Sequence, residues 1–299
     1  MEEQRWGDGM TMKAATKTVW MLILAAFLIG LGLVGIGLAF GGNVPVSFGP
    51  SGMRFQSLKD GRVYDARMQA FADRESLTGV ATEPITDMTL HMVSGDIRIK
   101  PTDASEVSWE VRTNDPSRYQ VTQRQGELRI EFRETVIFGI GFFDSGGTND
   151  EIIVLVPQGM ELQDLSLRNV SGTINIVDDL LVRTLDITSV SGDIVLEGLS
   201  LADPAGTDLS ISSVSSNIHV QLANLAALNL EMVSGTAEVT AFYLDDFTIS
   251  SNTVSGQVSK DDSSIVAGMG TTTTGSGSKR MQIDLVSGNV ELNNATLSR

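Results

Sequence analysis

The chain has 299 residues, of which 41% are hydrophobic and 19% charged, a mixture typical of folded globular proteins and unlike that of disordered chains. Its formal net charge of -16 disfavours nucleic acid and anionic lipid headgroups as partners, because both are themselves negatively charged. Cysteine is absent, which excludes disulfides, thiolate nucleophiles and zinc-thiolate sites.

The first feature in chain order is the uncharged stretch VWMLILAAFLIGLGLVGIGLAF, within residues 19–41. About 22 apolar residues suffice to cross a hydrocarbon core of roughly 30 Å, so this segment is predicted to be a transmembrane helix. Arg5, Lys13 and Lys17 precede it, which places residues 1–18 in the cytoplasm and exports the remainder of the chain. A cleaved signal peptide is the alternative, but the apolar stretch is longer than the usual signal core of roughly 7 to 15 residues.

Residues 42–84 are predicted to form a linker or stalk, since GGNVPVSFGPSG is followed by a mixed polar stretch whose spacing permits one short helix. From residue 85 onward apolar and polar residues alternate with the period of two that is typical of half-buried strands. Residues 85–299 therefore form the predicted exported domain, and it is all-β. The early segments EVSWEVRTN, YQVTQRQGELRIEFRE and EIIVLVPQGMEL are predicted to be opening strands that widen and cap one end.

A short motif, VSGDI at residues 93–97, returns six more times in similar form, at intervals of about 20 residues after the first gap. Serine follows the valine in every copy, and glycine follows the serine in all copies except one, where Ser216 stands instead. Glycine and short polar side chains favour turns, so each copy is predicted to be a turn between two strands. The predicted turn residues are Ser94, Gly95, Asp96, Ser171, Gly172, Ser191, Gly192, Asp193, Ser234, Gly235, Ser255, Gly256, Ser287 and Gly288.

Apolar residues occupy alternate positions on both sides of each turn, so every copy has one dry face, which it can bury only by stacking on other copies. The predicted fold is a single-stacked β-solenoid of about 20-residue repeats, in which consecutive copies form consecutive rungs about 4.8 Å apart. The copy at Val254 reads FTISSNTVSG, with an extra pair of residues before the valine. We expect a β-bulge at that copy.

Neither histidine indicates catalysis, because His91 and His219 each stand alone on the outward side of a predicted strand, without triad or metal-ligand spacing. A calcium ladder along the turns would require acidic residues at a strict short period, whereas only Asp96 and Asp193 are acidic. We expect turn Ser and Asn side chains to hydrogen-bond to one another along the stack instead. No catalytic residue, cofactor site or metal site is predicted, and the protein is not expected to be an enzyme. A polysaccharide-acting enzyme with paired carboxylates is the remote alternative.

Two insertions interrupt the repeat. VIFGIGFF, at residues 136–143, is an uncharged apolar run followed by the loop-like DSGGTND. As a buried strand this run would be ordinary core, and as a projecting hairpin it would offer a partner contact. The contact residues would be Ile137, Phe138, Ile140, Phe142 and Phe143. The second insertion, residues 261–279 with AGMGTTTTGSGSK, is predicted to be a flexible loop and lacks the spacing of a phosphate-binding loop.

The repeated VSGDI-type turns, the segment VPQGMELQDLSLRNVSG and the upstream EVSWEV resemble the bacterial putative-adhesin family, also called the toast-rack domain, over residues 85–299. The resemblance implies a fold and brings no catalytic residues. Members with one N-terminal span and an exported β domain are associated with envelope-stress systems of the phage-shock type, so the resemblance implies a similar role here.

We therefore expect a non-catalytic, single-pass binding or scaffold module in the cell membrane, with its C-terminal domain outside the cytoplasm. Its predicted partner is another envelope or membrane protein, within an envelope-stress or membrane-associated signalling complex. An adhesin or cell-surface structural protein is the alternative. The open ends of a solenoid and the glycines of the predicted span also permit a homo-oligomer.

Overall fold

The computed structural model describes residues 46–49, 52–55, 75–133, 150–177, 180–199, 206–222, 225–275 and 277–295. The chain divides into two compact units, residues 1–70 and 71–299. In the first unit β1 (Val46–Gly49) and β2 (Gly52–Phe55) form an antiparallel hairpin, where the sequence predicted only a linker. The predicted span, residues 19–41, lies outside the described residues, and among the described ones no helix is long and apolar enough to cross a membrane.

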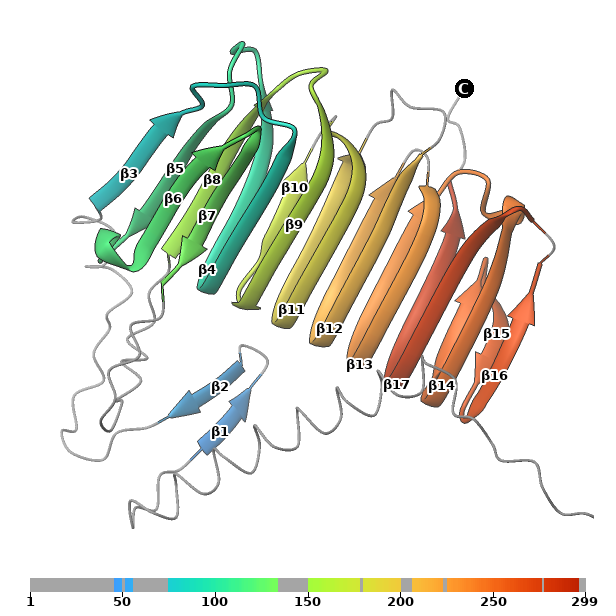
Figure 1. Cartoon of the computed structure of the whole chain (residues 1–299). Helices are drawn as coiled ribbons and strands as arrows, with labels where there is room; N and C mark the ends of the chain where they lie inside the picture. The colour runs from blue at the N-terminus through green and yellow to red at the C-terminus, as the bar shows by residue number, and fades with distance from the viewer. Residues whose placement is uncertain are drawn as a thin grey trace, which may run out of the picture. The chain divides into compact units, whose positions relative to one another are not determined.

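The second unit is built from long strands, each carrying one copy of the valine-serine motif, that pair in parallel (Figure 1). In spatial order they are β4 (Asp87–Thr102), β9 (Glu161–Ser171) continued by β10 (Ile174–Val177), β11 (Leu181–Leu199), β12 (Thr207–Leu222), β13 (Leu225–Ala241), β17 (Lys279–Asn294) and β14 (Phe247–Lys260). We call the segments before the motif the first sheet and those after it the second sheet. This stacking bears out the all-β solenoid.

The core lies between the two sheets, because alternate side chains of both halves of each rung point inward. In β11, Leu185 and Ile187 of the first sheet and Ile194 and Leu196 of the second are all fully buried, and the same positions are apolar in most other rungs. In-register pairing follows, since a shift by one residue would turn every apolar side chain of a rung towards water.

The end of the stack beyond β4 is closed by strands from residues 75–157. β7 (Glu127–Phe132) and β8 (Asp150–Pro157) complete one further rung, because β7 pairs with the first half of β4 and β8 with the second half. The outer strands, antiparallel to their neighbours, are β6 (Tyr119–Arg124) on β7, preceded by the 3₁₀ turn η1 (Pro116–Arg118), then β5 (Ser108–Thr113) on β8 and β3 (Glu75–Val80) on β5.

These strands confirm that the segments before the second motif copy cap one end. β3 lies within the predicted linker, and its pairing with β5 adds a strand that begins at Glu75 to the sheet of the β domain. The apolar run at residues 136–143 falls between β7 and β8, outside the described residues.

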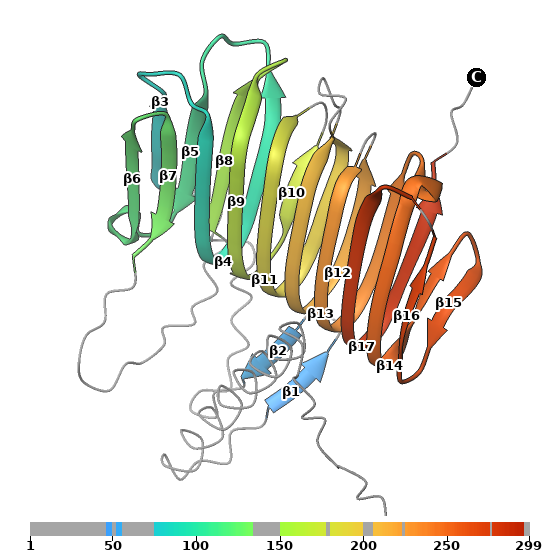
Figure 2. The same cartoon turned by 45° about the vertical axis from the view of Figure 1, so that its right-hand side comes forward.

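The other end of the stack differs from the predicted order. β17, the last copy in sequence, lies between β13 and β14 in both Figure 1 and Figure 2, so consecutive copies do not form consecutive rungs there. The prediction of a flexible loop at residues 261–279 is also wrong. This segment forms β15 (Ser263–Ala267) and β16 (Gly270–Thr274), which pair antiparallel with the second and first halves of β14. Threonine and other β-branched residues favour strands, and the glycines let the segment turn.

The predicted bulge at Val254 is absent. The ladder between β14 and β17 runs through Ile249, Ser251 and Thr253 without a register shift. The offset between paired residues is the same from Phe247–Lys279 to Lys260–Leu292, so this copy contains no extra residues, and Ser251 and Thr253 take buried inward positions. The register shift in β14 lies instead at Val258 and Ser259, against β15. The 3₁₀ turn η2 (Leu244–Asp246) precedes this rung.

Candidate functional site

The turn glycines form one row along the stack and are required by the backbone. In spatial order the row is Asp150, Gly95, Gly172, Gly192, Ser216, Gly235, Gly288 and Gly256. A Cβ added to Gly192 would lie 1.9 Å from the carbonyl oxygen of Gly172, and Gly192 has a φ of +127°. Ser216 fits because its φ is not positive and its Oγ lies 2.6 Å from Oγ of Ser213, both side chains being buried. The predicted turn glycines are therefore structural.

The motif valines and serines line the outer edge of the bend between the two sheets. Val170, Val190 and Val254 are 41%, 40% and 47% exposed, a position that the sequence analysis did not assign. Serines of this edge donate to carbonyl oxygens of the neighbouring rung, as Ser191 Oγ does to Val170 at 3.4 Å. The edge thus repeats, from rung to rung, one exposed valine and one serine.

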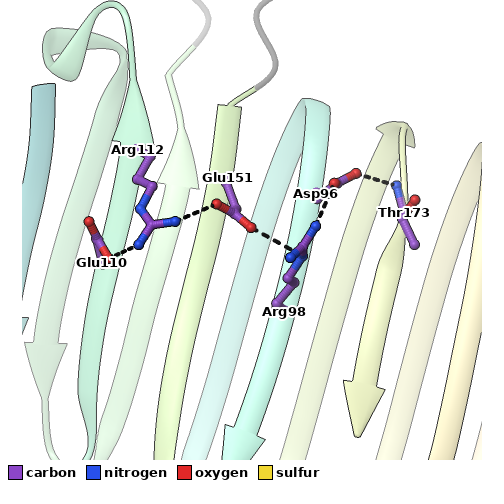
Figure 3. Close-up of polar contacts among 6 residues, drawn as sticks. All are labelled: Asp96, Arg98, Glu110, Arg112, Glu151 and Thr173. Atoms are coloured by element: carbon purple, nitrogen blue, oxygen red, sulfur yellow. Dashed lines mark hydrogen bonds and ion pairs between the residues drawn. The ribbon is translucent and has the colours of Figure 1, made fainter. Parts of the chain in front are cut away.

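Residues that follow the turn glycines form a hydrogen-bonded row on the outer face of the second sheet. Asn217 Nδ2 donates to Asp193 Oδ1 at 3.1 Å, and Thr236 Oγ1 donates to Asn217 Oδ1 at 3.1 Å. Near the other end Asp96 Oδ1 accepts from the backbone N–H of Thr173 at 3.0 Å (Figure 3). Bonding between turn side chains of neighbouring rungs is confirmed for this row. Within the described ranges no group of three or more His, Cys, Asp or Glu side chains is placed to hold a metal ion.

Towards the β3 end this outer face carries alternating charges that pair across three strands (Figure 3). Arg112 of β5 contacts Glu110 at 2.8 Å and Glu151 of β8 at 3.0 Å, and Arg98 of β4 contacts Glu151 at 3.1 Å and Asp96 at 3.4 Å. The Arg112 guanidinium, which donates to Glu110, lowers the pKa of that carboxyl below its ordinary value. Each arginine of this part of the face thus contacts two carboxylates.

Further along the same face, over β11, β12, β13, β17 and β14, the outward side chains line an open groove of about 590 Å³, which we call the acidic groove. Its carboxylates are Asp193, Glu238 and Glu291, and Glu238 and Glu291 are register partners on adjacent strands. His219 lies beside them, with Nδ1 3.3 Å from Glu238 and Nε2 3.9 Å from Glu197. None of the described residues that line the groove is lysine or arginine. The sequence predicted that His219 stands alone, and this prediction is wrong, because two glutamates lie beside it.

Neighbouring rungs are about 4.8 Å apart, so register places Glu238 and Glu291 side by side on one sheet. Both side chains are exposed and point the same way. Glycoside hydrolysis requires two carboxyl groups on opposite sides of the scissile bond, whereas Glu238 and Glu291 lie on the same side. The groove suits binding of positive charge better than acid-base chemistry.

One buried polar pair was not predicted at all. The Tyr119 hydroxyl donates to Asp150 Oδ2 at 2.9 Å, and both side chains are buried at the β3 end of the stack. Asp150 occupies the row of the turn glycines, next to Gly95. Burial, and then the Asp150 carboxylate, raise the pKa of the Tyr119 phenol far above its ordinary value of 10.0.

The family follows from the repeat and its stacking together. A family model described as Toastrack DUF4097 matches residues 85–299. The chain belongs to the toast-rack family. No curated protein is detectably similar to this toast-rack chain.

Solved structures with detectable similarity to this toast-rack protein include a putative cell adhesion protein from Clostridium sporogenes, with 13% identity, a TM-score of 0.40, and coverage of 75% of this chain and 100% of the other. A putative adhesin from Bacteroides fragilis has 14% identity, a TM-score of 0.42, and coverage of 74% and 97%. A putative lipid binding protein from Parabacteroides distasonis has 11% identity, a TM-score of 0.33, and coverage of 76% and 98%. The predicted contact residues between 137 and 143 lie outside the described part of this toast-rack chain.

Proposed function

We propose that this toast-rack domain is a non-catalytic binding module, held outside the membrane by a single-pass anchor at residues 19–41. In this proposal it is an accessory of an envelope-stress or membrane-associated signalling complex, and its partner is another envelope or membrane protein with a basic surface. The observation that carries the proposal is the acidic groove, where Asp193, Glu238 and Glu291 line one concave face without lysine or arginine among the described lining residues.

Charge explains why the groove favours a partner. Like charges on adjacent strands of a sheet destabilise it, and Glu238 and Glu291 are such neighbours. A basic side chain placed between them relieves that repulsion and also speeds association with an acidic molecule of net charge -16. The carboxylates around Arg98 and Arg112 are already paired with these arginines and offer no comparable attraction.

The test is site-specific photocrosslinking of the full-length chain in its own membrane, with the photoreactive group at exposed Asn289 in the groove. The groove variant carries Glu238→Lys and Glu291→Lys. The matched control carries Asp164→Lys and Asp186→Lys, which make the same change in net charge at exposed outward positions of the first sheet. We expect an integral membrane or envelope protein to be captured by the wild type and the control, and at least about tenfold less by the groove variant.

Equal capture by both variants would show that the groove is not the contact. An adhesin or cell-surface structural protein is the second candidate function, and the repeated exposed valines Val170, Val190 and Val254 favour it, because equal contacts along a stack allow multivalent attachment. Capture of no membrane protein, together with attachment of cells that carry the full chain to foreign cells or matrix, would establish that second candidate.

A further inference from the structure

The end of the stack formed by β15 and β16 is an open sheet edge on both sheets. Among the described strands, β15 and β16 each pair with β14 alone, so each leaves one row of backbone N–H and C=O groups without a strand partner. An unpaired edge is a template for a strand from another chain. Proteins usually protect such edges with charged side chains, proline or a covering segment.

This edge lacks the usual protection by side chains. From Ser263 to Ser278 the sequence SSIVAGMGTTTTGSGS contains no charged residue and no proline. Met269, between the two strands, is 83% exposed, and Ile265 and Val266 are only partly buried against the core. The edge is therefore neutral and partly apolar, in a chain whose net charge is -16.

The edge strands at the opposite end of the stack carry charged residues. Its edge strand β3 begins at Glu75, and its edge strand β6 ends at the exposed Arg124. Charges at an edge disfavour pairing with a further strand, because the pairing would bring them against a second chain. Only one end of the described stack thus has edge strands without a charged residue.

We propose that the β15–β16 end pairs with the same end of a second copy of this chain, forming a two-fold symmetric dimer. Antiparallel pairing of a strand with its own copy follows from two-fold symmetry, in which the same patch serves on both subunits. A partner must also supply two edge strands, one for each sheet, at the separation of β15 and β16. A second copy has both strands at that spacing by construction, whereas a single extended peptide would satisfy only one sheet.

Electrostatics points to the same contact. Two molecules of charge -16 repel each other, and the repulsion is weakest where the facing surfaces carry no charge. Pairing would also remove Val266 and Met269 from water and continue the core between the two sheets from one copy into the other.

The test compares full-length wild type with Thr273→Lys in detergent solution, using sedimentation to measure the protein mass. Thr273 is exposed on β16 and faces outward with Ser250 of β14, so lysine there leaves the core unchanged. The matched control is Thr122→Lys, at an exposed position of β6 at the other end. We expect wild type and control to sediment at twice the chain mass of 32.0 kDa, and Thr273→Lys to need at least about tenfold higher concentration to dimerise.

Hydrogen exchange on the wild type alone supplies a second measurement. Amides of residues 263–274 are expected to exchange more slowly at concentrations where the dimer forms than after dilution. A wild type that stays monomeric would overturn the proposal. So would a dimer that survives Thr273→Lys, since it would be held elsewhere, for instance by the predicted span, and so would a dimer that both lysine variants weaken equally.

Discussion

At the scale of single residues, the repeat is explained by how closely neighbouring backbones approach at the bend. Each turn glycine faces the carbonyl of the next rung, and for Gly172 and Gly192 a Cβ would come within 2.0 and 1.9 Å of that oxygen. The motif recurs because the same close approach recurs at every rung except the one with Ser216.

Replacing Gly192 by alanine is therefore expected to lower the free energy of unfolding by roughly 2–5 kcal/mol, from the contact with Gly172 and from strain at positive φ. The matched control is Gly159→Ala, which also has a positive φ of +75° but nothing within 4 Å of the new Cβ, and should lose only about 1–2 kcal/mol. Urea unfolding measures both. Equal losses would mean that conformation alone, without the neighbouring carbonyl, selects glycine in the motif.

The buried phenol of Tyr119 makes stability depend on alkaline pH. Its pKa is raised in the folded protein, so the unfolded chain ionises first, near pH 10, and the free energy of unfolding falls as pH rises above that value. Tyr119→Phe should be about 1–3 kcal/mol less stable at neutral pH, because Asp150 loses its donor, but should lack this alkaline loss. Denaturant titrations between about pH 8 and 11 measure the difference.

Tyr243→Phe serves as the control for this pH dependence, since Tyr243 is 64% exposed. It should retain the alkaline loss of the wild type. If Tyr119→Phe lost stability above pH 10 as steeply as the wild type does, another group would have to be responsible.

At the scale of elements, β14 shows how a rung tolerates an irregular sequence. Its register with β17 is constant, and Ser251 and Thr253 stand at inward positions where β17 has Ile283 and Leu285, so pairing is kept while polar side chains enter the core. Ser251 is fully buried there, and its Oγ has no hydrogen-bond partner. The rung next to β15 and β16 is thus less apolar than those in the middle of the stack.

Ser251→Ala is expected to raise the free energy of unfolding by about 1 kcal/mol, because it removes a buried hydroxyl that makes no hydrogen bond. The matched control is Ser213→Ala, where the hydroxyl is also buried but is bonded to Ser216. That variant should lose about 1 kcal/mol or more, since it leaves Ser216 without its partner. Thermal and urea unfolding of both variants measures these changes in the free energy of unfolding. Destabilisation by Ser251→Ala would mean that its hydroxyl has a hydrogen-bond partner and would contradict the prediction.

At the scale of the whole second unit, the order of rungs decides where charges and edges lie. Because β17 inserts between β13 and β14, Glu291 comes next to Glu238 and contributes to the acidic groove. The same insertion leaves β14 at the end of the stack, where β15 and β16 extend it with an uncharged edge. Both proposals, the groove as a partner site and the edge as a dimer contact, depend on this one exchange of rungs.

The sequence by itself determined the repeat, the inward and outward side chains of each rung and the all-β fold, whereas the predicted turns are bends within long strands such as β11 and β12. These are local properties: alternation of period two assigns faces, and glycine at a bend reports a backbone conformation. Even the hydrogen bonds between Asp193, Asn217 and Thr236 were predictable in kind, because equivalent positions of stacked repeats must be neighbours.

Only the tertiary structure decided which rungs are neighbours. Glu238 and Glu291 are 53 positions apart in the chain, and no local pattern distinguishes β17 after β13 from β17 after β14, since both pairings bury the same apolar face. The Tyr119–Asp150 pair and the edge formed by β15 and β16 depend on the same long-range choices. Stacked repeats are interchangeable in their local contacts, and the connections between them select the final order.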